Sequence, residues 1–278
     1  MTDSSLPTDL ALIVNLALQE DIGDGDITSL LIADNLQAKA HILCREEAIL
    51  CGIAWVEETY RNIDSRLKIQ WNFKDGDSLK KDAQVAEIVG NARAILTGER
   101  TALNFLQTLS GTATITKQYT ERLKGTSVIL LDTRKTLPGM RNAQKYAVRV
   151  AGGSNHRKGL YDAYLIKENH IQSCGNISNA IATARKINPN KVLEVEVQNL
   201  EQLSEAISAK PDIIMLDNFK LQDIRKAVTI NPGNAKLEVS GNINQESLVN
   251  VAKTGVDYIS VGALTKHCRA IDFSLLLV

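Results

Sequence analysis

Six short apolar runs recur after Gly125, and each ends at a polar residue or a glycine. The end points are Asp132, Lys167, Glu196, Asp217, Ser240 and Gly262, which lie 21 to 35 residues apart. Because segments of helical character follow these runs, the spacing is typical of repeated βα units around a parallel sheet. The sequence therefore predicts an α/β fold with an incomplete TIM-like α/β barrel, and a doubly wound sheet is the alternative.

The first hundred or so residues have a different pattern. An apolar run after Pro7–Asp9 predicts a helix that ends near Asp21. Leucines recur at helical spacing between Asn91 and about Leu123. Short strands are expected between these two helices, at 39–52, 71–73 and 85–89.

Composition excludes several classes of protein. The 278 residues include 32 basic and 32 acidic side chains, so binding of nucleic acid or an anionic membrane through bulk charge is not expected. The apolar stretch Leu10–Leu18 is about half the length of a bilayer span, and no Lys or Arg precedes Lys39 as a secretory signal requires. The four cysteines form no CxxC pair and predict free thiols. We expect a cytoplasmic enzyme or binding protein.

Charge is segregated along this neutral chain. Between Arg134 and His170 there are eight Lys or Arg, two His and only two acids, whereas 192–224 holds seven acids and two lysines. If the strand ends converge, one side of the site is cationic and suits a substrate with several carboxylates or phosphates. Its candidate residues are Arg134, Lys135, His156, Arg157 and Lys167.

Acidic side chains dominate the opposite side. Glu194 and Glu196 are two residues apart and face the same side of a strand, and Asp217 ends the next strand. Carboxylates at adjacent strand ends can bind ribose hydroxyls or hold Mg²⁺ through water. The alternative is a buried ion pair with a lysine such as Lys167.

The last two strands end in small residues, Ser240-Gly241 and Gly262-Ala263. This pattern is similar to the phosphate site after the final strands of many TIM barrels. The residues thus predict group transfer from an activated sugar phosphate to a polycarboxylate. An aldolase-type reaction with a Schiff base at Lys167 is the alternative.

A series of sequence blocks also stands in a recognisable order: Ala17–Asp21 with Gly25–Thr28, Gly98–Asn104, Asp132–Thr136 with Pro138-Gly139, Gly152-Gly153 with Asn155–Arg157, Lys167–Ile171, Glu194–Val197 and Ser260–Thr265. The Asn-His-Arg and Lys-Glu-Asn-His-Ile blocks are the most specific. Together the blocks resemble the quinolinate phosphoribosyltransferase family over nearly the whole chain.

The resemblance implies an N-terminal α/β sandwich domain over 1–108, to which the strand at about 270–278 returns, and a barrel domain over 109–269. It implies a homodimer, or a higher oligomer built on it, whose site borrows Arg100 from the partner subunit. The reaction joins quinolinate to 5-phosphoribosyl 1-pyrophosphate (PRPP) with Mg²⁺. It gives nicotinate mononucleotide, pyrophosphate and CO₂ in NAD biosynthesis, which makes the enzyme a pentosyltransferase.

The resemblance also assigns a role to each matching residue. Quinolinate's carboxylates contact Arg100, Arg134, His156, Arg157 and Lys167. Lys135 contacts phosphate between the substrates, and Glu196 and Asp217 face the ribose hydroxyls and Mg²⁺-pyrophosphate, with any metal contact indirect. The 5-phosphate is held by Ser240, Gly241, Gly262 and Ala263, and the catalytic set is Lys135, Lys167, Glu196 and Asp217.

Four places depart from the family pattern: Lys158 after Asn-His-Arg, Asn242 after Ser-Gly, Lys266-His267 after Leu-Thr, and Leu137 before Pro-Gly. Three alternatives are a molybdate-transport-linked relative, a non-catalytic anion-binding dimer and a nicotinate-using phosphoribosyltransferase. The intact Asn-His-Arg and Lys-Glu-Asn-His-Ile blocks argue against the first alternative, and the surplus of cations argues against the last.

Overall fold

The computed structural model describes residues 5–278 and divides the chain into two compact units. The first unit contains the chain up to Lys117, Thr136–Gly152 and Leu264–Val278. The second unit contains Gln118–Lys135 and Gly153–Ala263. The first four positions of the predicted 1–108 domain lie outside the described residues.

An antiparallel sheet with helices forms the first unit. Its strand order is β12-β1-β5-β3, and β2 and β4 form a separate pair. Its elements are α1 (Leu10–Ile22), the 3-10 helix η1 (Ser29–Leu31), β1 (Gln37–Cys44), β2 (Ala48–Ile49), α2 (Ile53–Ile63), β3 (Lys68–Trp71), β4 (Ser78–Leu79), β5 (Ala83–Asn91), most of α3 (Ala92–Arg122), α4 (Arg141–Val150), most of α10 (Ala263–Lys266) and β12 (Phe273–Leu277).

The last strand of the chain belongs to this sheet. β12 pairs antiparallel with β1, with Leu275 opposite Ile42 and Phe273 opposite Cys44. Phe273 and Leu275 are buried in the same apolar cluster as Ile42, because alternate residues of a strand face the same side. Residues more than 200 positions apart therefore share one core.

The division of the chain differs from the boundary after residue 108. That boundary falls inside α3, whose Leu109 is fully buried with Trp55 of α2 and Tyr146 of α4. The aromatic rings of Trp55 and Tyr146 lie 5.3 Å apart, and the Tyr146 hydroxyl donates to Asp75 at 2.8 Å. This packing joins α4 to the first unit, although it follows the first barrel strand in sequence.

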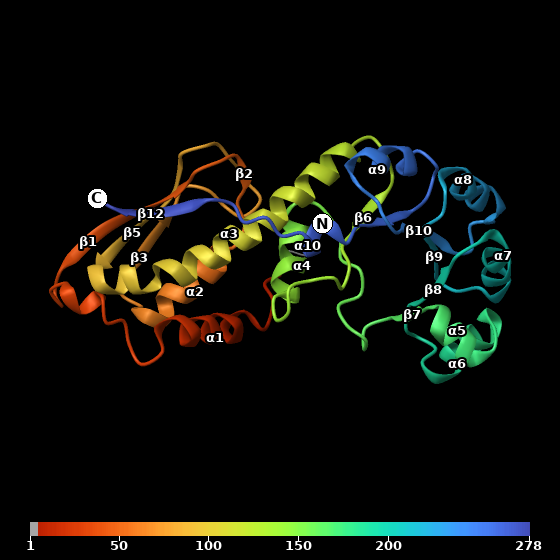
Figure 1. Cartoon of the computed structure of the whole chain (residues 1–278), viewed down its shortest axis with the longest axis horizontal. Coiled ribbons are helices and arrows are strands. Elements are labelled where there is room, and N and C mark those ends of the chain that lie inside the picture. The colour runs from red at the N-terminus through yellow and green to blue at the C-terminus, as the bar shows by residue number, and fades with distance from the viewer. Residues whose placement is uncertain (1–4) are drawn as a thin grey trace. The chain divides into compact units, whose positions relative to one another are not determined.

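Six parallel strands form the second unit. They are β6 (Ile129–Leu131), β7 (Tyr164–Ile166), β8 (Leu193–Val197), β9 (Ile213–Asp217), β10 (Lys236–Ser240) and β11 (Tyr258–Ser260). The helices α5 (Glu168–Cys174), α6 (Ile177–Ile187), α7 (Leu200–Ala209), α8 (Leu221–Ile230) and α9 (Gln245–Ala252) alternate with the later strands and follow one another beside them in Figure 1.

The strand order explains why this unit is an incomplete barrel. It is β6-β11-β10-β9-β8-β7, which is the cyclic order of a barrel rather than the reversed order of a doubly wound sheet. Within the described residues, the sheet is open between β6 and β7. The predicted α/β fold is confirmed, and all six predicted strands are present.

Two further sequence expectations can be compared with the described residues. None of the helices within 5–278 has the length and apolar composition that crossing a membrane requires. All four cysteines lie in this range and are free thiols, as predicted.

Candidate active site

One cavity of about 400 Å³ lies at the carboxyl ends of the strands of the second unit. Parallel α/β folds place their active sites at this end, where the loops after the strands converge. Nine of the twelve predicted site residues line the cavity: Arg134, Lys135, His156, Arg157, Lys167, Glu196, Asp217, Ser240 and Gly241. The other three, Arg100, Gly262 and Ala263, are not among its lining residues.

Asp132 at the end of β6 fixes the cationic loop that carries His156. Its fully buried carboxylate accepts hydrogen bonds from the His156 backbone N–H at 2.9 Å and the Asn155 amide at 2.7 Å. The backbone of Ser154 also bridges to Leu131 of β6. These hydrogen bonds hold the Asn-His-Arg block against the end of β6 and fix its position.

Arg157 lies close to another cation. Burial, together with the positive charge of Arg134, lowers the pKa of the Arg157 guanidinium from its usual value. An arginine nevertheless stays protonated in a protein, so the two guanidinium groups concentrate positive charge on one side of the cavity. Such a pair is stabilised by anions with several negative charges, and planar guanidinium groups suit carboxylates.

The lysine and the glutamate of the site form an ion pair. Lys167 Nζ lies 2.5 Å from Glu196 Oε2, and the glutamate is 8% exposed whereas the lysine is 43% exposed. The sequence had left open an ion pair between Lys167 and an acid of this strand. The structure forms that ion pair with Glu196 and not with Glu194. Asp217 ends β9 and accepts a hydrogen bond from the Asn218 amide at 2.9 Å.

The loop after β10 has a conformation that few residues adopt. Gly241 has a φ of +94°, and a Cβ there would lie 2.2 Å from Asn218 Oδ1, so this position requires glycine. Asn242 has a φ of +51° and donates from its side-chain amide to Asn218 Oδ1. Asparagine tolerates the left-handed region better than most residues, so Asn242 can stand where the family pattern has glycine.

Gly262 and Ala263 follow β11, and Gly262 lies near the loop after β6 that carries Thr133 and Lys135. A Cβ on Gly262 would lie 3.1 Å from the side chain of Lys135 and 3.6 Å from that of Thr133. Ala263 begins the short helix α10. Glycine at 262 therefore leaves room for Lys135, which itself lines the cavity.

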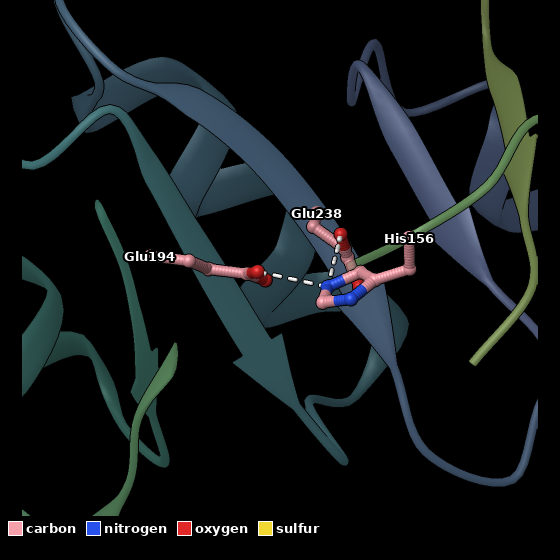
Figure 2. A group of neighbouring side chains, drawn as sticks. All are labelled: His156, Glu194 and Glu238. Atoms are coloured by element: carbon pink, nitrogen blue, oxygen red, sulfur yellow. Dashed lines mark ion pairs between the residues drawn. The ribbon is translucent and has the colours of Figure 1, made fainter. Parts of the chain in front are cut away.

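A buried acidic cluster lies in the wall of the same cavity. His156 Nε2 is 2.8 Å from Glu194 Oε2 and 3.7 Å from Glu238 Oε2 (Figure 2). The side chains of Glu194 and Glu238 are 4% and 0% exposed. Burial and the negative charge of Glu194 raise the pKa of Glu238 to about 8, although His156 acts in the opposite direction.

Sequence reasoning missed Glu238. The signal was its place two residues before Ser240, which puts both side chains on the same face of β10, as Glu194 stands before Glu196 on β8. One group of His, Cys, Asp or Glu side chains among the described residues is close enough together to coordinate a metal ion. It consists of His156, Glu194 and Glu238. Glu196 and Asp217 are not in that group.

Arg100 lies in the first unit and lines a separate cavity of about 270 Å³ with Asp21, Asp26 and Thr97. The acids of the N-terminal motif hold the neighbouring turns of α3. Thr97 donates to Asp26 at 2.8 Å, and Thr101 donates to Asp21 at 3.4 Å. Residues of the Ala17–Asp21 and Gly25–Thr28 blocks thus form hydrogen bonds with the part of α3 that carries Arg100.

The other departures from the family pattern do not line the active-site cavity. Lys158 is exposed and its backbone N–H donates to Asp162. Leu137 donates through its backbone N–H to Gln144 and lines an apolar cavity of the first unit with Pro138 and Gly139. Lys266 and His267 are exposed.

Fold and site together define an α/β enzyme that acts on anionic substrates. Cations, carboxylates and a glycine-containing loop meet at the carboxyl ends of parallel strands, where such an enzyme binds its substrates. Family models give the particular group. The quinolinate phosphoribosyl transferase N-terminal domain matches residues 26–110, and the C-terminal domain of the same family matches residues 112–276.

Individual relatives agree with the family models. The chain is 43% identical to a probable nicotinate-nucleotide pyrophosphorylase [carboxylating] of Bacillus subtilis, over 96% of this chain and 92% of the relative. The solved nicotinate-nucleotide pyrophosphorylase of Francisella tularensis is 52% identical with a TM-score of 0.95, covering 99% of this chain and 98% of its own. NadC from Streptococcus pyogenes has a TM-score of 0.94 at 40% identity, with 99% of each chain covered. The chain belongs to the quinolinate phosphoribosyltransferase family.

Proposed function

We propose that this chain transfers the phosphoribosyl group of PRPP to quinolinate and decarboxylates the product to nicotinate mononucleotide, a step of NAD biosynthesis. The observation that carries the proposal is that one cavity holds both the paired guanidinium groups of Arg134 and Arg157 and the carboxylates of Glu196 and Asp217. The cations suit a dicarboxylate, and the carboxylates suit a ribose that becomes cationic.

Quinolinate binds on the cationic side. Arg134, Arg157, His156 and Lys167 contact its two carboxylates, and Arg100 of the partner subunit completes this set in a homodimer. Lys167 is the more exposed member of its ion pair, so it is free to turn toward a bound carboxylate while Glu196 stays in place. Binding in this way sets the pyridine nitrogen against the anomeric carbon, and such positioning supplies much of the rate.

Phosphoribosyl transfer takes place on the carboxylate side. The C–O bond to pyrophosphate breaks as the pyridine nitrogen attacks, and the ribose passes through an oxocarbenium-like state that Glu196 and Asp217 stabilise. The 5-phosphate lies at Ser240, Gly241, Gly262 and Ala263, and Lys135 contacts the phosphate between the two substrates. Glycines, which let a ligand approach the backbone closely, and a lysine beside them suit a phosphate.

The donor set fits a magnesium ion carried by pyrophosphate. The cavity offers the carboxylates of Glu196 and Asp217, and Mg²⁺ in proteins is usually held by one or two carboxylates, several waters and substrate phosphates. When bound, the ion neutralises charge on the departing pyrophosphate. Glu196 and Asp217 would hold the ion there.

Decarboxylation needs no separate cofactor. Once the pyridine nitrogen is alkylated it is cationic, and it accepts the electrons left at the adjacent carbon when CO₂ departs. A proton then adds at that carbon to complete nicotinate mononucleotide. We place the whole reaction in the cytoplasm.

An assay of purified protein with quinolinate, PRPP and Mg²⁺ tests the proposal. We expect nicotinate mononucleotide, no product when Mg²⁺ is chelated, and no product when nicotinate replaces quinolinate. Quinolinate binding without any product, in folded protein, would instead support a non-catalytic anion-binding protein. Product from nicotinate would contradict the assignment of the cationic side.

A further inference from the structure

Glu238 is a buried acid in the wall of a cavity that we propose to bind an anion. If ionised, it would weaken the binding of that anion. The cavity that it lines has to receive a dicarboxylate, and a negative charge on Glu238 would repel it. The side chain is fully buried on β10, so solvent does not screen it. Either Glu238 weakens binding or it carries no charge.

The contacts of Glu238 favour the uncharged state. Ligand atoms of His156, Glu194 and Glu238 all lie within 4.8 Å of one another. Two ionised carboxylates and one imidazolium would leave a net negative charge buried at this place, whereas a proton on one carboxyl makes the cluster neutral. The elevated pKa of Glu238, about 8, agrees with that geometry.

The elements around Glu238 contribute few other charges. On β8 the facing acid is Glu194, since Glu196 pairs with Lys167. On β9 its register partner is Met215, which does not titrate, and on β11 the partner is Tyr258, with Ser260 two residues further along the strand. The segment between α4 and β7 supplies two cations, His156, whose Nε2 lies 3.7 Å from Glu238 Oε2, and Arg157, which lines the same cavity.

We propose that Glu238 is a positioning residue for the dicarboxylate substrate. As an uncharged carboxyl, it leaves Glu194 as the acid that pairs with His156, and the positive charge of His156 is presented to the cavity. The inference rests on the proposed function, because it assumes that a dianion occupies the cationic side.

An ion pair joins His156 to Glu194 in this cluster. His156 Nε2 lies 2.8 Å from Glu194 Oε2 and 3.7 Å from Glu238 Oε2, so Glu194 is the nearer of the two carboxylates.

The pH dependence of the Michaelis constant for quinolinate tests the proposal. In the unsubstituted enzyme, Glu238 ionises as pH rises through about 8, and we expect KM for quinolinate to rise at least about fivefold between pH 7 and pH 9. Glu238→Gln keeps the side chain neutral, so its KM for quinolinate stays level over that range. KM for PRPP serves as an internal reference, and the exposed substitution Glu201→Gln is the matched control.

Equal pH slopes for the unsubstituted enzyme and Glu238→Gln would overturn the proposal. A spectroscopic readout keeps the test independent of turnover and of the variant's folding. The infrared band of a protonated carboxyl should be present in the ligand-free enzyme at pH 7 and lost at pH 9.5, and its absence at pH 7 would contradict the proposal.

The metal content of the purified enzyme provides a third test. One equivalent of a transition metal that is bound by the purified enzyme and lost in Glu238→Gln would show that the cluster holds a metal rather than a proton. If no turnover is found at all, the infrared band still decides the state of Glu238, and quinolinate binding by calorimetry at pH 7 and 9 replaces the KM measurement. Failure of the proposed function is thereby distinguished from failure of this inference.

Discussion

At the scale of single residues, Gly241 in the loop after β10, which we propose to bind the 5-phosphate, has no room for a side chain. Gly241→Ala places a Cβ at 2.2 Å from Asn218 Oδ1 on a backbone with a φ of +94°. We expect KM for PRPP to rise at least about tenfold and stability to fall by about 1–3 kcal/mol. Asn242→Gly is the matched control, because glycine readily adopts the φ of +51° at that position, and it should stay within about twofold of the unsubstituted enzyme. Equal effects in both variants would contradict this account of the loop.

Arg157 and Lys158 are adjacent cations with different expected roles. Arg157 lines the cavity, whereas Lys158 is exposed and does not. Loss of a charged hydrogen bond costs about 1.5–3 kcal/mol, so Arg157→Ala should raise KM for quinolinate at least about tenfold. Lys158→Ala should change it less than about twofold. Steady-state kinetics with saturating PRPP measure KM for quinolinate in both variants. An unchanged KM in Arg157→Ala would show that Arg157 does not bind a carboxylate of the substrate.

The residues that sequence reasoning found and missed differ in one respect. Polar end points such as Asp217 and Ser240 stand out because they terminate apolar runs. Glu238 stands inside such a run, where a charged residue suggests the solvent face of a strand. Its charged neighbour His156 comes from a loop more than 80 positions earlier, and no local pattern carries that information.

At the scale of elements, β12 joins the beginning and end of the chain. Leu275 is 7% exposed in the core of the first unit, whereas its neighbour Leu276 is 45% exposed. Leu275→Ala should therefore cost about 2–5 kcal/mol of unfolding free energy and Leu276→Ala less than about 1 kcal/mol. Urea unfolding of the two variants provides the comparison. Equal losses would mean that β12 contributes no buried face to the sheet.

The elements themselves were predictable to different degrees. The six barrel strands were predictable because each is a short, mainly apolar run followed by a polar residue or a glycine. Helix α2 was not predicted, although Trp55, Val56, Thr59 and Tyr60 have helical spacing and are buried. Its first backbone N–H groups donate to Asp75, more than 20 residues later, so the usual capping residue is missing from the local sequence.

At the scale of the whole molecule, the proposed homodimer makes a prediction about subunit mixing. Arg100→Ala and Arg157→Ala should each lose most of their activity. A mixed dimer has one Arg100→Ala subunit and one Arg157→Ala subunit. If Arg100 contributes to the partner's site, both substitutions fall in the same site, and the other site is intact. Equal mixing after reversible dissociation should then restore about a quarter of the unsubstituted activity. No restoration, with exchange verified by mass, would place Arg100 in the site of its own subunit or outside any site.

The measurement that tests the central claim most directly follows the fate of each carboxylate. Quinolinate labelled in the carboxyl next to the pyridine nitrogen is incubated with the enzyme, PRPP and Mg²⁺, and labelled CO₂ and pyrophosphate are counted together. We predict one labelled CO₂ per pyrophosphate, and none from substrate labelled in the other carboxyl. Pyrophosphate without CO₂, or CO₂ from the other carboxyl, would contradict the claim that this cavity couples phosphoribosyl transfer to decarboxylation.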